Sequence, residues 1–250
     1  MSPRLLPIVS ALVALVLTLA LAALALALGG YSPVEAFAAL LRGALGSPSA
    51  ILSITLVRTV PLLLTGLAVA LAFRAGVWNI GAEGQLYAGA VAAVWMGLQV
   101  GAWPAWMAVP SVLLASAVAG AAWAAIPAVM KLRLGVGEVI TTLLLNFVAI
   151  DLSAWLIHGP LQEARGVYTQ SEPIAEAARL PLLVPGTRLH IGFALAIGLA
   201  VLMAIVMRAT RAGFFVRAVG ASADAARIAG RMPVARVVAV AFLISGASYG

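Results

Sequence analysis

Long apolar runs separated by short polar segments dominate the chain, and this pattern predicts membrane-spanning helices. The runs are close to the ~20 residues that an α-helix needs to cross a bilayer. The predicted spans are 5–28, 51–73, 84–100, 104–130, 138–157, 191–207 and 237–250. The last run holds only about 14 residues, too few to cross, so we expect the C-terminal part of the protein to lie beyond this sequence. The expected fold is all-α, one polytopic transmembrane bundle over residues 1–250 with seven spans begun.

The first run could instead be a secretion signal. Residues 5–28 are uncharged and follow Arg4, and the Ala-Leu-Ala at 25–27 is compatible with a cleavage site. The apolar core of a signal peptide is usually ~7–15 residues, much shorter than this run. We therefore interpret the run as a membrane anchor, followed by an external loop with a short amphipathic helix over residues 33–41.

One polar, glycine-rich stretch interrupts the apolar pattern. Residues 73–90 read FRAGVWNIGAEGQLYAGA and place Asn79, Glu83 and Gln85 between membrane spans. Unpaired backbone and charged side chains are costly in hydrocarbon unless they face protein or a water-filled path. Glycines also let a broken helix offer N–H and C=O groups to a polar solute. We predict a broken or re-entrant segment that lines a solute pathway, with Asn79 and Gln85 ranked ahead of Glu83.

Glu83 has a second interpretation. Its carboxylate could cap a helix, or pair with Arg74 or Arg58 and hold the bundle together, because buried ion pairs are common structural devices. The sequence does not decide between solute contact and a structural role for this residue.

A second polar group lies at the start of the span 138–157. Glu138, Thr142 and Asn146 are four residues apart and therefore share one helix face. A threonine in a membrane helix more often bonds to its own backbone. The amide of Asn146 needs several partners, so interhelical hydrogen bonding and solute binding are equal alternatives for it. We include all three residues in the predicted substrate pathway.

Composition and charge fit a membrane protein. Hydrophobic residues make up 64% of the 250 residues and charged residues 9%, whereas soluble domains are about one quarter charged. The net charge of +7 could suggest a nucleic-acid partner, but the basic residues gather at span ends, which membrane topology explains better.

The positive-inside rule sets the predicted orientation. With the N-terminus inside, ten basic residues lie on the inner side: Arg4, Arg74, Lys131, Arg133, Arg208, Arg211, Arg217, Arg227, Arg231 and Arg236. Four lie outside: Arg42, Arg165, Arg179 and Arg188. This asymmetry predicts a multi-pass protein of the inner cell membrane with a cytoplasmic N-terminus and no nucleic-acid partner.

The sequence contains no recognisable catalytic or metal-binding pattern. Cysteine is absent, and the two histidines, His158 and His190, lack metal-site spacing. A phosphate-binding GxxxxGK[ST] loop is impossible because the single lysine, Lys131, is followed by Leu132. We therefore expect no catalytic residue, no metal and no cofactor on this chain, which would not be an enzyme, and any ATPase would be a partner subunit.

The polar loop 208–236 contains a candidate docking element. Residues 220–230 are alanine-rich, with Asp224 near the start and Gly230 as a stop, which fits a short capped helix. Such a helix, held between two spans and flanked by arginines, could dock a cytoplasmic partner. An ordinary solvated loop with positive-inside charge is the alternative.

Three motifs together resemble the permease subunits of ATP-binding-cassette (ABC) importers. The motifs are WNIGAEGQLYAGA, GVGEVITTLLLNFVA followed by HGPLQ, and GFFVRAVGASADAARIAG. They are most similar to simple-sugar and nucleoside permeases, relatives of the ribose and branched-chain amino acid permeases, and the resemblance covers residues 59–250. Asp224-Ala225-Ala226 with Gly230 is similar to the E-A-A-x-x-x-G pattern of importer permeases, with Asp in place of Glu.

The resemblance implies partners and a coupling element. Such permeases work as homo- or heterodimers, bind two cytoplasmic ATP-binding subunits and receive solute from an extracytoplasmic binding protein. ATP binds to the partner subunits, and the inner loop of the permease acts as a coupling helix, here residues 221–230. The residues expected to couple to the ATPase are Arg217, Gly220, Asp224, Ala225, Ala226 and Gly230.

We predict a permease subunit that imports a polar solute, a nucleoside or a simple sugar. A path lined by amides and hydroxyls suits an uncharged polyhydroxylated solute. A branched-chain amino acid permease of the same superfamily is the main alternative. An ion- or proton-coupled secondary transporter that uses Glu83 or Asp151 is a further alternative, as is a purely structural membrane subunit.

Overall fold

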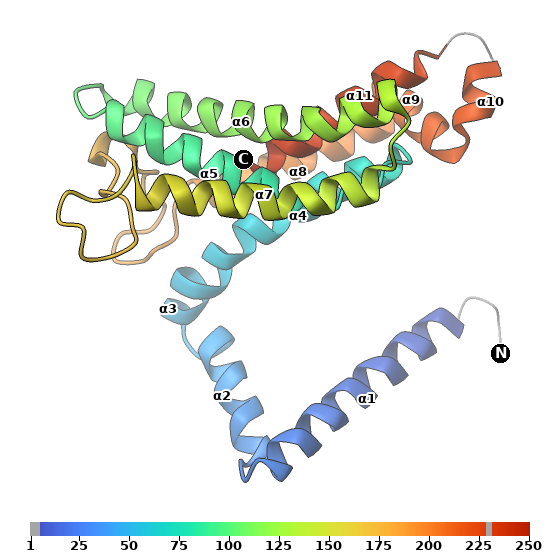
Figure 1. Cartoon of the computed structure of the whole chain (residues 1–250). Coiled ribbons are helices and arrows are strands. Elements are labelled where there is room, and N and C mark those ends of the chain that lie inside the picture. Colours follow the sequence, from blue (N-terminus) through green and yellow to red (C-terminus); the bar gives the residue numbers. More distant parts are fainter. Residues whose placement is uncertain (1–5, 229–231) are drawn as a thin grey trace. The chain divides into compact units, whose positions relative to one another are not determined.

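A computed structural model describes residues 6–228 and 232–250, so Arg4, Gly230 and Arg231 lie outside the described residues. The chain is mainly helical (Figure 1), and an isolated antiparallel bridge joins Leu182 to His190. This confirms the expected all-α fold. The chain divides into two compact units, residues 1–57 with 186–188, and residues 58–185 with 189–250.

The first unit contains the N-terminal helices. They are α1 (Leu6–Leu28), α2 (Pro33–Leu45) and α3 (Pro48–Ala50), followed by one π-helical turn, Ile51–Thr55. At the start of α2, the Ser32 hydroxyl accepts a hydrogen bond from the Glu35 N–H at 3.3 Å, and Pro33 occupies the first helical position. Serine before proline is a strong helix start. The predicted amphipathic helix is therefore confirmed, and it extends beyond 33–41 to Leu45.

The second unit contains the remaining helices. They are α4 (Leu56–Arg74), α5 (Ala82–Gln99), α6 (Ala105–Leu134), α7 (Glu138–His158), α8 (Gly192–Ala209), α9 (Arg211–Ala221), α10 (Ala223–Ile228) and α11 (Val234–Tyr249). One 3₁₀ turn, Glu176–Ala178, lies in the long segment between α7 and α8.

Five helices of the described chain are long and apolar enough to cross a membrane. They are Ile8–Leu28, Pro48–Arg74, Ala105–Leu134, Glu138–His158 and Gly192–Ala209. Two of the seven predicted spans do not meet this criterion. The 18-residue α5 contains Glu83, Gln85 and three glycines, which lower its hydropathy, and α11 is apolar but has 16 residues.

Helix α6 is the centre of the second unit and packs against α5 and α11 (Figure 1). The crossing of α6 and α11 depends on two glycines. A Cβ on Gly120 would strike the Gly246 carbonyl oxygen, and a Cβ on Gly246 would strike Ala124 and the Gly120 carbonyl. Small residues let membrane helices approach closely, where dispersion contacts stabilise the pair.

Apolar side chains from α9, α10 and α11 meet the end of α4 in one buried cluster. Its members are Ala72, Ala75, Val77, Ala128, Val219, Ala226, Val237, Val238, Ala241 and Phe242. The cluster joins the short helices after α8 to the membrane helices. A second cluster, made of Val100, Ala108, Val112 and Ala178, packs the segment before α8 against the start of α6.

The helix predicted over 221–230 is wrong at its start, and its predicted end lies outside the described residues. Helix α9 covers Arg211–Ala221, the chain turns at Ser222, and α10 covers Ala223–Ile228. The Thr210 hydroxyl accepts a hydrogen bond from the Gly213 N–H at 3.2 Å and starts α9. The Ser222 hydroxyl accepts a hydrogen bond from the Ala225 N–H at 3.2 Å and caps α10, and Asp224 lies in the first turn of α10, as predicted.

Candidate functional site

The helix break predicted within 73–90 is present, and it covers residues 75–81 between α4 and α5. Gly76 has a positive φ of 72°, a left-handed conformation that favours glycine and commonly ends helices. The Val77 N–H then bonds back to the Ala72 carbonyl at 3.0 Å, which closes the end of α4. Helix α5 resumes at Ala82, so most of the predicted stretch is helical and only its middle is broken.

Two amide side chains exchange hydrogen bonds beside the break. Asn79 donates to the Gln85 Oε1 at 3.0 Å, and Gln85 donates to the Asn79 Oδ1 at 3.0 Å. Asn79 also donates to the Ser245 hydroxyl at 3.0 Å and accepts from the Gly81 N–H at 3.0 Å. Asn79 is 2% exposed and Gln85 is 1% exposed. Their polar atoms therefore satisfy one another inside the protein.

Helix α7 supplies partners for the backbone of the break. The Ile80 N–H donates to the Thr142 hydroxyl at 3.2 Å, and the Asn146 amide donates to the Ile80 carbonyl at 3.0 Å. Asn146 also accepts from the Gly84 N–H at 2.9 Å. One α7 face thus supplies hydrogen-bond partners for the backbone of Ile80 in the break and of Gly84 in α5. We call Asn79, Gln85, Thr142, Asn146 and Ser245 the polar cluster.

Glu138 lies on the same face of α7 and is paired. Its Oε2 lies 2.6 Å from the Lys131 Nζ, and its Oε1 accepts from the Trp78 N–H at 3.5 Å. The Glu138 side chain is 12% exposed and that of Lys131 is 30% exposed. The ion pair connects the end of α6 to the start of α7 and to the break. The shared face predicted for Glu138, Thr142 and Asn146 is therefore confirmed.

Glu83 differs from the polar cluster in its surroundings. It lies in the first turn of α5 and is exposed. Within residues 6–228 and 232–250, no ion pair joins it to Arg74 or Arg58. The sequence ranks Asn79 and Gln85 ahead of Glu83 as pathway groups, but in this structure those two amides face protein and Glu83 is the accessible group.

Sequence reasoning missed Ser245, which bonds Asn79 from a position 166 residues away. A hydroxyl beside Gly246 in an apolar helix was the available signal, since serine and glycine mark helix contacts in membranes. Its partner could not be read from the sequence, because nothing local links residue 245 to the break.

The predicted coupling residues lie around α9 and α10. A Cβ on Gly220 would strike the Arg74 carbonyl oxygen and approach the Gly76 N, so α9 touches the break directly. Ala226 is buried, whereas Ala225 is exposed. Exposed Asp224 pairs with Arg227 at 3.2 Å. The predicted residue Gly230 lies outside the described residues.

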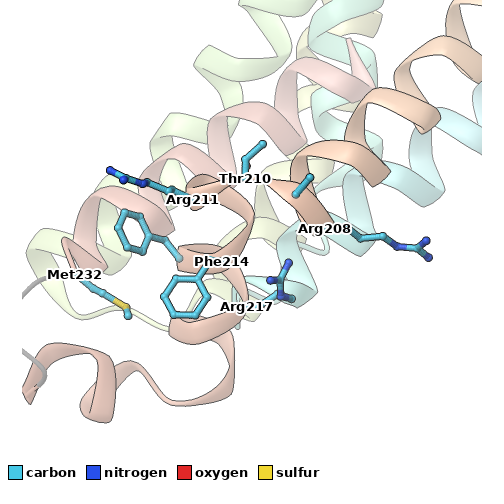
Figure 2. Close-up of a pocket in the computed structure, with 8 residues that line it drawn as sticks. Arg208, Thr210, Arg211, Phe214, Arg217 and Met232 are labelled. Atoms are coloured by element: carbon cyan, nitrogen blue, oxygen red, sulfur yellow. The ribbon is translucent and has the colours of Figure 1, made fainter.

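A basic cavity of about 630 Å³ lies where α8 meets α9. Arg208, Arg211 and Arg217 line it together with Phe214, and Figure 2 shows these four residues. No ion pair to these arginines is found in the described part of the chain. The predicted coupling residue Arg217 therefore borders an accessible, positively charged hollow. In the described ranges no three His, Asp or Glu side chains come together as metal ligands.

Comparison with known proteins gives consistent matches. The family described as branched-chain amino acid transport system permease component matches residues 51–250. A glucose ABC transporter permease protein of Haloferax volcanii is 42% identical, over 89% of this chain and 62% of its own length. A guanosine ABC transporter permease protein of Bacillus subtilis is 37% identical, over 96% and 68%. A nucleoside ABC transporter permease protein of Lactococcus lactis subsp. cremoris is 33% identical, over 96% and 67%.

The chain therefore spans about two thirds of the length of these relatives. No solved structure matches it.

Proposed function

The chain belongs to the family of branched-chain amino acid transport system permease components, and on this premise we propose that it is the permease subunit of an ATP-driven ABC importer. The proposed solute is a nucleoside or a simple sugar, because the relatives are named for glucose, guanosine and nucleosides. A branched-chain amino acid is the alternative solute, because the family description names transport of such amino acids.

One contact carries this proposal: α9 packs against the helix break. Gly220 lies so close to the backbone of Arg74 and Gly76 that no side chain fits between them. Val219 and Ala226 share a buried cluster with Ala75 and Val77 on the break. A displacement of α9 and α10 would therefore move residues 75–81, because packed interiors transmit strain.

The polar cluster is the proposed moving part of the pathway wall. It holds the break to α5, α7 and α11, so a shift of the break requires these bonds to move together or exchange. We therefore keep Asn79, Gln85, Thr142 and Asn146 as pathway residues that position its wall. Glu83 lies outside the polar cluster, and it is the proposed direct contact with the solute because it is exposed.

The proposed partners follow from this arrangement. ATP would be bound and hydrolysed by two cytoplasmic subunits that dock on α9 and α10, beside the basic cavity. A second permease subunit and an extracytoplasmic solute-binding protein would complete the importer. The arginines at the end of α8 and along α9 support a cytoplasmic position for these helices and for the N-terminus.

Uptake by membrane vesicles tests the function. The permease is co-expressed with ATP-binding subunits from the same organism, and vesicles receive labelled guanosine or D-glucose with a candidate solute-binding protein. Uptake should require ATP and the ATPase and should survive an uncoupler. Uptake by the permease alone that an uncoupler abolishes would instead establish a secondary transporter.

The coupling contact is tested with Gly220→Val. The added side chain would collide with the Arg74 carbonyl and separate α9 from the break. We expect assembly with the ATPase to persist while solute uptake falls at least tenfold, because the ATPase can no longer move the break. Gly198→Val is the control, since Gly198 has open space around its Cα. Equal uptake by both variants would contradict this coupling route.

A further inference from the structure

Helix α7 carries an unusual strip on the face turned away from the bundle. Phe147 is 60% exposed and Trp155 is 63% exposed. Asp151 lies between them in sequence and is also exposed. The three residues are spaced at i, i+4 and i+8, so they follow one another along a single helix face.

Asp151 lies on the side of α7 opposite the polar cluster. It follows Thr142 by nine residues, which is about two and a half turns at 3.6 residues per turn. Thr142 is 0% exposed and contacts the break, so Asp151 projects away from it. Across residues 6–228 and 232–250, no ion pair or hydrogen bond engages the Asp151 carboxylate.

The depth of Asp151 makes lipid an unsuitable neighbour. At 1.5 Å per residue, it lies about 20 Å from the start of α7 and about 10 Å from its end. Both ends of this candidate span would be near the surfaces of a hydrocarbon core that is about 30 Å thick. Carboxylates at such depth almost always face water-filled paths or polar partners.

We propose that Phe147, Asp151 and Trp155 form a solute-contact strip on the pathway wall, which binds the sugar ring of a nucleoside or a simple sugar. This inference rests on the proposed function. The carboxylate would accept hydrogen bonds from two neighbouring hydroxyls, and such charge-assisted bonds are about twice as strong as neutral ones. The aromatic rings would cover the apolar C–H face of the ring or stack on a base. The strip adds three residues to the pathway that the polar cluster does not include.

Accessibility of the strip can be measured directly, because these 250 residues contain no cysteine. Asp151→Cys is introduced into the assembled importer and treated with a membrane-impermeant maleimide. Leu202→Cys is the control on an exposed apolar face of α8, and Ala149→Cys is the control on the buried face of α7. We expect Asp151→Cys to react at least tenfold faster than either control. Reaction no faster than at Leu202→Cys would overturn the proposal, since it would place the strip against lipid or another subunit.

Transport kinetics supply the second measurement. Asp151→Asn should raise the half-saturating concentration for the transported probe at least tenfold, because the strip would lose its charged acceptor. Trp155→Leu should raise it severalfold, whereas Trp95→Leu, which removes a comparably exposed tryptophan from α5, should leave it within twofold. Normal wild-type uptake with unchanged half-saturation in Asp151→Asn would refute the strip alone. Absence of ATP-dependent uptake in the wild-type importer would refute the proposed function and the strip with it.

Discussion

Replacing Asn146 by leucine tests whether the polar cluster holds the break in place. The side chain makes two hydrogen bonds, both to backbone atoms on or beside the break. Leucine has the same branched shape, with methyl groups in place of the amide oxygen and nitrogen, but it can neither donate nor accept a hydrogen bond. The variant therefore leaves the Gly84 N–H and the Ile80 carbonyl without these partners, in a region where water cannot easily replace them.

The expected loss can be worked from these two bonds. An orphaned buried polar group costs about 1–3 kcal/mol in a soluble protein. Interhelical hydrogen bonds in membranes average about 0.6 kcal/mol and reach about 1.7 kcal/mol, because the unfolded helices also find partners. Two bonds on this scale give a decrease of about 1–3 kcal/mol in the free energy of unfolding.

The measurement is unfolding of the purified permease in detergent micelles by titration with sodium dodecyl sulfate, followed by circular dichroism. Leu144→Ala is the control, because Leu144 is exposed on the other face of α7 and should change stability by less than about 0.5 kcal/mol. If Asn146→Leu unfolds like the wild type but loses solute uptake, the reasoning is refuted. Asn146 would then be a solute contact, the other role that its sequence position allows.

Two further stability predictions use the same unfolding measurement. Gly246→Val should lower the free energy of unfolding by about 1–3 kcal/mol, because its side chain would clash with Gly120. Gly198→Val should lower it much less, because Gly198 has open space around it. Equal losses in the two variants would show that the close crossing of α6 and α11 is unimportant. Lys131→Met should lower the free energy of unfolding by about 1–2 kcal/mol, because it leaves the partly buried Glu138 carboxylate without its cation. The double variant Lys131→Met/Glu138→Gln should recover most of that loss, and no recovery would mean that Lys131 acts through packing rather than through the ion pair.

The helical segments and the break could be predicted from the sequence, because both depend on local physical chemistry. A run of apolar residues ends where a glycine permits a left-handed turn, as at Gly76. The four-residue spacing of Glu138, Thr142 and Asn146 predicts their common helix face, because it is close to the 3.6-residue period of the α-helix. These are properties of a few neighbouring residues, and no tertiary information is needed to obtain them.

Local patterns could not predict which polar groups meet across the fold. The Asn79–Ser245 bond joins residues brought together by α5, α6 and α11. The sequence places α9 in a polar loop, because its arginines fit the positive-inside rule. Thr210, a good first residue for a helix, and the buried Val219 were the signals for a helix that packs inward. The roles of the polar residues in transport stay predictions.

The length of α6 connects the site to the bilayer itself. Its 30 residues extend about 45 Å, some 15 Å more than the hydrocarbon core is thick. The helix must therefore tilt, project into water or thicken the surrounding lipid. Lys131 in its last turn holds Glu138, which in turn accepts from the backbone of the break at Trp78. A change in bilayer thickness would change the tilt of α6 and, through the Lys131–Glu138 pair, the position of the break. Membranes of different thickness would thus set different resting positions of the break beside the proposed solute path.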